Sequence, residues 1–136
     1  MSTRSLTIIQ SKEEEIVVMY RQMDGYPKGH GLDLAEFLSG MVIVNGIGSA
    51  TPAKAANGVG CLAAQVVAHF KNDIGNIYLY PAGARNYRYY IEVNKSIYLK
   101  IYSAHWNDEI PEKILFEGTP EEVKNWIEKG GENVEE

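Results

Sequence analysis

The sequence has one cysteine, Cys61, among its 136 residues. A disulfide within the chain is therefore impossible, and a cytoplasmic location is the simpler expectation, because the cytoplasm is reducing. Long hydrophobic runs are also missing. The most apolar stretch, Gly58–Phe70, is shorter than the about 20 residues that cross a bilayer. We expect neither a signal peptide nor a membrane as partner.

Basic clusters are lacking as well. The net charge is −5, the isoelectric point is about 5.2, and Lys and Arg are scattered along the chain. Binding to a nucleic-acid backbone depends on clustered basic side chains that release counterions. We therefore expect no nucleic acid as partner. The acidic run Glu13–Glu15 is typical of a solvated surface.

Signatures of metals and cofactors are absent from the sequence. His30, His69 and His105 show no metal-ligand spacing, and no C-x-x-C or H-x-x-x-H motif occurs. Gly58–Ala63 matches the pattern G-x-G-x-x-A. A dinucleotide site would need a strand before this motif and an acidic residue about 20 positions later. Neither is present, so we expect no metal and no cofactor.

The composition is that of a globular protein, with 45% hydrophobic and 23% charged residues. The length suits a single domain over residues 1–136, with a flexible acidic tail at about residues 130–136. The order of predicted elements indicates an α+β fold. We expect an antiparallel sheet of about five strands packed against two or three helices, which form a single layer.

The first half of the chain predicts a hairpin and two helices. Thr3–Gln10 and Glu15–Gln22 are expected to pair, although apolar residues on both faces leave their register open. A short helix follows at Leu32–Ser39. Asn45–Asn57, rich in Gly, Ala, Ser and Pro, predicts a long irregular connection of the kind that is often functional. Asn57–Lys71 predicts a helix with Asn57 as N-cap. It is apolar on nearly all sides and is therefore expected to be central and buried.

The second half predicts strands at Asn76–Tyr80, Tyr87–Val93, Ile97–Tyr102 and Lys113–Glu117. A three-residue loop between the second and third of these pairs Val93 with Ile97 and Ile91 with Leu99, which keeps one face wholly apolar. A two-residue loop would place polar and apolar side chains on the same face, so we predict the three-residue loop. A capping box at Thr119–Glu122 begins a last helix, which Gly130-Gly131 ends.

The polar face of these strands is rich in tyrosine. It carries Arg88, Tyr90, Glu92, Tyr98, Lys100 and Tyr102. Exposed tyrosines beside basic side chains could bind a partner, a ligand or stacked bases. Alternatively, a helix or a second subunit covers this face, which is the commoner outcome.

The loop Asp24–Gly31 is the main candidate for a functional site, because dense Gly and Pro predict a tightly specified loop. His30 precedes a helix, whose dipole favours a neutral imidazole, so His30 is a candidate general base with Asp24 orienting it. Tyr26 and Lys28 add a phenol and an ammonium group as candidate ligand-binding residues. The same residues also suit a purely structural turn, and we favour that interpretation.

Other candidate ligand-binding residues are Asn45, Asn57 and Cys61. They fit a pocket where the Asp24–Gly31 loop meets the Asn45–Asn57 connection. A dyad of Cys61 with His69 is rejected, because eight helical residues separate the two by about 12 Å. Cys61 is more simply a buried, inert thiol, and His69 is expected to satisfy a local backbone group.

Four segments together carry a resemblance to a known family: Tyr20–Gly31, Leu34–Leu38, Ile43–Gly46 and Asn57–Gln65. They resemble an uncharacterised family of small proteins from bacterial and phage-like mobile DNA, including integron gene cassettes. The likeness runs from about Thr3 to Ile127 and is most specific in the D-G-Y-P-x-G-H-G loop. The resemblance implies one globular unit with a mobile-element origin, and it supplies no catalytic residue.

Three functions remain open. The first is a binding or accessory module that takes a small-molecule ligand and forms a homo-oligomer. The second is a small enzyme with His30 and Asp24 as an acid–base pair, which requires the two side chains to lie within about 3 Å or to share one water. The third is a partner-binding protein that uses the tyrosine-rich face.

Overall fold

The computed structural model describes residues 3–79, 86–103 and 113–131. Its main feature is a six-stranded sheet with the strand order β5-β2-β1-β6-β7-β8. The strands are β1 (Ser5–Ser11), β2 (Glu14–Arg21), β5 (Ile77–Tyr78), β6 (Tyr87–Val93), β7 (Ile97–Ser103) and β8 (Lys113–Gly118). The predicted α+β class is confirmed. Tyr80, which ends one predicted strand, and residues 132–136 of the predicted tail lie outside the described residues.

The sheet is mixed, because β1 and β6 run parallel, with Ser5 opposite Tyr87 and Gln10 opposite Glu92. The other strand pairs are antiparallel, as expected. Parallel neighbours need a long crossover between strands. The chain between β2 and β6 provides it and contains two of the helices.

The β1–β2 hairpin closes through Lys12 and Glu13, whose φ angles are 53° and 67°. Positive φ at both central residues is the signature of a type I′ turn. A bulge between Ile9 and Gln10 shifts the register. All residues from Ser5 to Ile9 are buried, so both faces of β1 are covered and the alternation that would set the register is lost.

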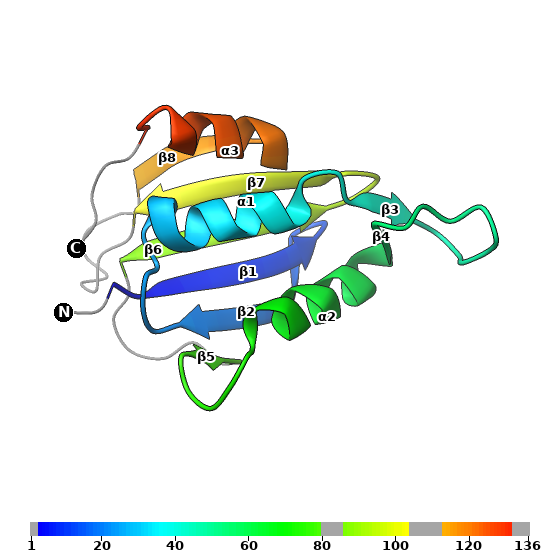
Figure 1. Ribbon diagram of the computed structural model, residues 1–136, viewed down its shortest axis with the longest axis horizontal. Coiled ribbons are helices and arrows are strands. Elements are labelled where there is room, and N and C mark those ends of the chain that lie inside the picture. The colour runs from blue at the N-terminus through cyan, green and yellow to red at the C-terminus, as the bar shows by residue number, and fades with distance from the viewer. Residues whose placement is uncertain (1–2, 80–85, 104–112, 132–136) are drawn as a thin grey trace.

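Three helices cover one face of the sheet in a single layer (Figure 1), which confirms the predicted arrangement. They are α1 (Leu32–Leu38), α2 (Gly58–Phe70) and α3 (Pro120–Glu128). α2 lies over β1 and β2, α3 lies over β7 and β8, and α1 lies between them. Their buried side chains form one core with the inward side chains of the sheet, and this core includes Leu34, Leu38, Leu62, Val66, Val123 and Ile127.

The helix α2 is buried along one side only. Leu62, Ala63 and Val66 face the sheet and are at most 2% exposed, whereas Ala64 and Ala68 are exposed. The prediction of a central and buried helix was therefore wrong for its outward side. Its outward positions hold small residues, which make the sequence apolar but tolerate contact with solvent.

The predicted pairing of β6 with β7 is confirmed. Val93 lies opposite Ile97 and Ile91 lies opposite Leu99, across a connection of residues 94–96. All four side chains are at most 5% exposed and belong to the core under the helices. The apolar inner face therefore determines the register, as the sequence indicated.

On the other face of the sheet, the tyrosine-rich strands are bound to one another. Glu92 accepts a hydrogen bond from Gln10 and forms an ion pair with Lys100, both at 3.1 Å. The ring of Tyr90 meets Tyr102 edge-on, with centroids 5.4 Å apart. All three helices of the described segments lie on the opposite face, so none of them covers the tyrosine-rich one.

A small arm projects from the end of the sheet (Figure 1). Its two parallel strands are β3 (Val42–Val44) and β4 (Ala55–Asn57), so the irregular connection is shorter than predicted. The sequence predicted that the side chain of Asn57 caps α2, but no such hydrogen bond forms. Its Oδ1 instead accepts a hydrogen bond from the Gly46 backbone at 2.7 Å and closes the arm. Ile47 in the arm is 78% exposed.

The capping box of α3 is confirmed. Thr119 accepts a hydrogen bond from the Glu122 backbone at 3.2 Å, and the Glu122 carboxylate accepts one from the Thr119 backbone at 2.9 Å. Gly130, with φ of 82°, follows the end of the helix, as the sequence predicted. This seats Val123 and Ile127 in the core.

Replacing Leu62 with alanine should lower the free energy of unfolding by about 2–5 kcal/mol, because a fully buried leucine leaves a cavity between α2 and the sheet. Leu79→Ala is the matched control, since Leu79 is 58% exposed, and it should change stability by less than about 0.5 kcal/mol. Urea unfolding of the two variants checks this. Equal losses would contradict the placement of α2.

Candidate functional site

His30 lies where β1, β2 and the loop before α1 meet, and its side chain is fully buried. Its Nε2 is 2.7 Å from Thr7 Oγ1, and its Nδ1 is 3.0 Å from Arg21 Nη1. The ring packs against Phe70 and against the edge of Tyr89, at centroid distances of 4.9 and 5.0 Å. Both ring nitrogens therefore have partners inside the protein, away from solvent.

The imidazole of His30 is neutral. A guanidinium can only donate, so Nδ1 accepts from Arg21, and the proton on Nε2 is donated to Thr7 Oγ1. Burial, and then the positive charge of Arg21, lower the pKa of His30 from 6.5 to about 3. The sequence also predicted a neutral ring, but burial, rather than a helix dipole, is the main cause.

Close backbone packing shapes the Asp24–Gly31 loop, of which Pro27–Gly31 forms a π-helical turn that runs directly into α1. Asp24 has a φ of 62°. A Cβ atom at Gly25 would lie 2.8 Å from Ser5 Cβ, and one at Gly29 would lie 2.5 Å from the Asp24 carbonyl oxygen. Only glycine fits such contacts. These contacts favour the structural interpretation of the loop.

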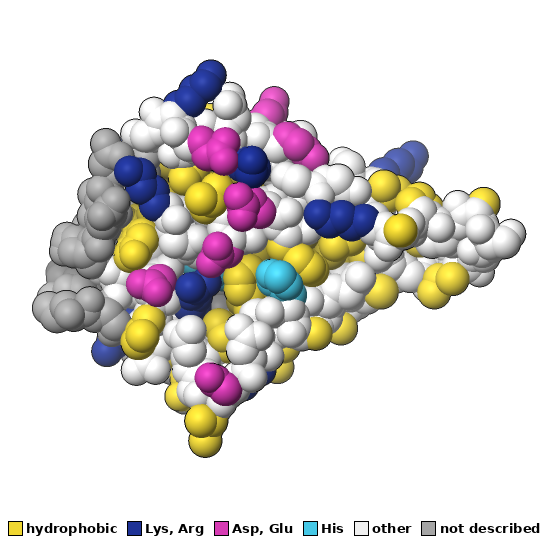
Figure 2. Space-filling view, in the orientation of Figure 1, with side chains coloured by type: hydrophobic (Ala, Val, Ile, Leu, Met, Phe, Trp, Pro, Cys, Tyr) yellow, Lys and Arg dark blue, Asp and Glu magenta, His cyan; other side chains and the backbone are white. Residues whose placement is uncertain are grey.

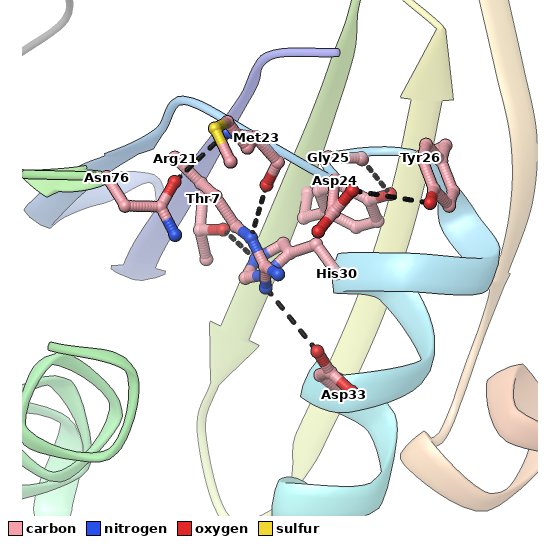
Figure 3. A network of polar contacts seen from close by, with 10 residues as sticks. Thr7, Arg21, Met23, Asp24, Gly25, Tyr26, His30, Asp33 and Asn76 are labelled. Carbon is pink, nitrogen blue, oxygen red and sulfur yellow. Dashed lines mark hydrogen bonds and ion pairs between the residues drawn. The ribbon is translucent and has the colours of Figure 1, made fainter. Parts of the chain in front are cut away.

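The side chains of Asp24 and His30 do not form the proposed acid–base pair (Figure 3). The Asp24 carboxylate accepts a hydrogen bond from the Tyr26 hydroxyl at 3.3 Å. Asp24 meets His30 only through its backbone carbonyl, which accepts from the His30 amide at 2.8 Å. The pairing hypothesis was wrong, because Thr7 and Arg21 already occupy both ring nitrogens.

A cleft of about 680 Å³ opens beside this network, between α1 and α2. It is lined by Arg21, Asp33, Glu36, Phe37, His69, Phe70, Asn72, Asn76 and Ile77. Figure 2 views this side of the molecule: acidic side chains gather over α1, and hydrophobic surface lies between the two helices. The cleft therefore combines charged and apolar walls.

Arg21, the last residue of β2, holds its guanidinium in a fixed position at the cleft. Its side chain is only 12% exposed. Nε donates to the Met23 carbonyl at 2.7 Å and Nη1 donates to His30 Nδ1, while Asp33 Oδ2 lies 3.5 Å from Nη1 (Figure 3). Nη2 has no partner within the part of the chain that the structure describes. A positioned donor group is thus left for a ligand.

Asn76 contributes a second donor. Its backbone carbonyl accepts from the Gln22 amide at 2.8 Å, and its Oδ1 accepts from the Met23 amide at 3.0 Å. The second bond fixes the orientation of the side-chain amide, because only the oxygen can accept. Nδ2 then points away from Met23, into the space beside the Arg21 guanidinium (Figure 3).

The wall opposite these donors belongs to α1. Asp33 and Glu36 are three residues apart and lie on one side of the helix. Phe37 stacks on His69 of α2, with centroids 4.2 Å apart and an interplanar angle of 21°. The sequence predicted that His69 satisfies a local backbone group, but its ring packs against Phe37 instead. The stacked pair bridges the two helices.

The other predicted ligand-binding residues do not line this cleft. Tyr26 and Lys28 precede α1, whereas Asn45 and Asn57 belong to the arm beyond its other end (Figure 1). The predicted pocket between the two loops was wrong, because the seven residues of α1, about 10 Å of helix, separate them. Cys61 is half-buried in the first turn of α2.

Reasoning from the sequence missed Thr7 and Arg21. Both side chains lie on the helix-covered face of the sheet, where strands normally place apolar residues. Polar residues at inward positions are a usable signal of a site, but reading it requires the register of β1 and β2. Phe37 and His69 meet only through the packing of two helices, which no local pattern reveals.

Within residues 3–79, 86–103 and 113–131, no three His, Cys, Asp or Glu side chains are grouped to hold a metal ion. No helix in these ranges is long and apolar enough to cross a membrane. His105 lies outside them. Comparisons with protein families, with curated proteins and with solved structures found no match.

The lowered pKa of His30 predicts acid sensitivity. Between pH 6.5 and about 3 the unfolded chain binds a proton at His30 that the folded chain excludes. The free energy of unfolding should therefore fall as the pH decreases from 6.5, by up to about 1.4 kcal/mol per pH unit from this group. The variant His30→Gln should be less stable than the wild type at pH 7.5, but its free energy of unfolding should lack the fall below pH 6.5 that His30 causes. Urea unfolding of both proteins at pH 7.5, 6 and 5 checks this.

A second measurement needs no variant. The NMR signal of the His30 ring should keep its chemical shift from pH 8 to pH 5, because the ring stays neutral. A midpoint near 6.5 in that titration would contradict the buried, arginine-bound state.

Proposed function

We propose that this protein is a small binding module whose cleft between α1 and α2 takes an organic molecule with a carboxylate or phosphate group. The observation that carries this proposal is the fixed guanidinium of Arg21 at the cleft, with Nη2 unpaired among the described residues. Nη2 carries two N–H groups that can donate to either oxyanion, and the guanidinium adds a positive charge that attracts it.

Preorganisation supports this role. The bonds from Arg21 to the Met23 carbonyl and to His30 hold the guanidinium before any ligand arrives, so less side-chain entropy is lost on binding. Asn76 Nδ2 adds a donor on the same side. The cleft volume of about 680 Å³ falls within the range typical of small-molecule sites.

Binding is favoured over catalysis. His30 is enclosed, and its one lone pair already accepts from Arg21, so it has no access to a substrate. His69 reaches the cleft but stacks on Phe37, and no described residue forms a hydrogen bond that would orient it as a base. A general base needs a defined path to the proton it removes.

Self-association, a cytoplasmic location and a mobile-element origin are further proposals. The projecting arm, with Ile47 78% exposed, supports a homo-oligomer. The single cysteine supports a reducing compartment. The resemblance in the Asp24–Gly31 loop supports the origin. Partner binding through the tyrosine-rich face has less support, because Glu92 and Lys100 already neutralise each other there.

Arg21→Lys tests the proposed site. Lysine keeps the charge but loses the Nη2 donors and the two bonds that hold the guanidinium in place, so the affinity for an oxyanion ligand should fall about tenfold or more. The ligands are carboxylic acids, amino acids and phosphate esters, tested first by thermal shift and then by calorimetry. Circular dichroism confirms that the variant folds.

Lys95→Gln is the control. It removes a positive charge from the exposed turn between β6 and β7, outside the cleft, and should leave affinity unchanged. The proposal fails when no compound binds, or when binding survives unchanged in Arg21→Lys.

A further inference from the structure

The cleft presents charges of both signs. Arg21 lines it from the sheet, while Asp33 and Glu36 line it from α1. Asp33 Oδ2 lies 3.5 Å from Arg21 Nη1, longer than the about 2.8 Å of a strong charge-assisted hydrogen bond. Asp33 also remains 52% exposed. The acidic wall therefore keeps capacity for a second partner.

This arrangement disfavours ligands with a single charge. A plain anion on Arg21 would lie beside Asp33 and Glu36, which repel it, and a plain cation on the acidic wall would be repelled by Arg21. A molecule with a negative and a positive group side by side satisfies both walls. Like-charge contacts of this kind provide discrimination between ligands.

We propose that the ligand is a free α-amino acid, with its carboxylate on Arg21 and Asn76 and its ammonium group on Asp33 and Glu36. This inference rests on the proposed function, the binding of an oxyanion in the same cleft. In an α-amino acid the nitrogen and the carboxylate carbon are about 2.5 Å apart. Asp33, at 3.5 Å from Nη1, is close enough to meet the ammonium group of a ligand held by Arg21.

The remaining walls select the side chain. Phe37 and its stacking partner His69 give the cleft its accessible ring surface, whereas Phe70 and Ile77 lie deeper and are only 9% and 4% exposed. Burying an apolar side chain against them is favourable, whereas a second charged group would lose water without gaining a partner. An amino acid with an apolar or aromatic side chain is therefore the expected ligand.

The test begins with the full-length protein and each of the twenty standard L-amino acids in a thermal-shift measurement. The best of them is then compared by calorimetry with two analogues, the amine that lacks its carboxylate and the acid that lacks its ammonium group. Each analogue should bind about tenfold or more weakly than the amino acid, because each leaves one charged wall unpaired.

Glu36→Gln and Asp33→Asn separate the two charges. Both residues are exposed, so folding should be retained. Each variant should weaken binding of the amino acid about fivefold or more while binding of the ammonium-free acid stays equal or becomes tighter. Glu13→Gln, in the exposed turn between β1 and β2 and outside the cleft, raises the net charge by the same amount and serves as the control.

Two failures can be told apart. An ammonium-free acid that binds as tightly as the amino acid, and loses affinity in Arg21→Lys, overturns the amino-acid assignment and leaves the proposed function standing. Binding of phosphate esters alone, lost in Arg21→Lys, likewise overturns only the amino-acid assignment. Binding that is unchanged in Arg21→Lys, or the absence of binding by amino acids, acids and phosphate esters alike, overturns both.

Discussion

The hydrogen bond from Arg21 to His30 holds together the part of the molecule where the sheet, the loop before α1 and the cleft meet. It requires a neutral imidazole, because a protonated ring would have no lone pair for Arg21 and would place two positive charges 3.0 Å apart. Burial keeps the ring neutral, and Thr7 fixes its tautomer from the other side. A group that looks like a catalytic base in the sequence therefore acts as a support for an arginine.

The cleft begins where the apolar core ends. On β1, the inward position changes from Ile9 to Thr7, and on β2 it changes from Met19 to Arg21. In both strands a single step of two residues replaces packing by hydrogen bonding. The core thus supplies a rigid base, and the polar ends of the same two strands supply the groups that α1 and α2 leave accessible.

The sequence predicted the features that depend on neighbouring residues. The capping box at Thr119 and the turn after Val93 are local, and one wholly apolar face decided the register of β6 and β7. The site depends on distant contacts instead. His30 and Thr7 are 23 positions apart, and their contact could not be foreseen while apolar residues on both faces of the hairpin left its register open.

The extent of α2 burial was misjudged for a different reason. Alanines such as Ala64 and Ala68 raise the apolar content of a helix without showing which side is covered. The loop before α1 was correctly recognised as tightly specified, but the Asp24 carboxylate bonds to the Tyr26 hydroxyl instead of to His30. His30 links the loop to the cleft through its bond with Arg21.

The position of β1 also has a consequence for the order in which the fold assembles. β1 pairs with β2 almost at once, but its other neighbour is β6, and the contact between Gln10 and Glu92 spans 82 positions of the chain. On a ribosome the hairpin emerges long before the strand that completes its parallel edge. Until then β1 presents an unpaired edge, although α2 already has the two strands on which it packs. Contacts of such long range slow folding, so the central strand is among the first to be synthesised and among the last to be fully paired.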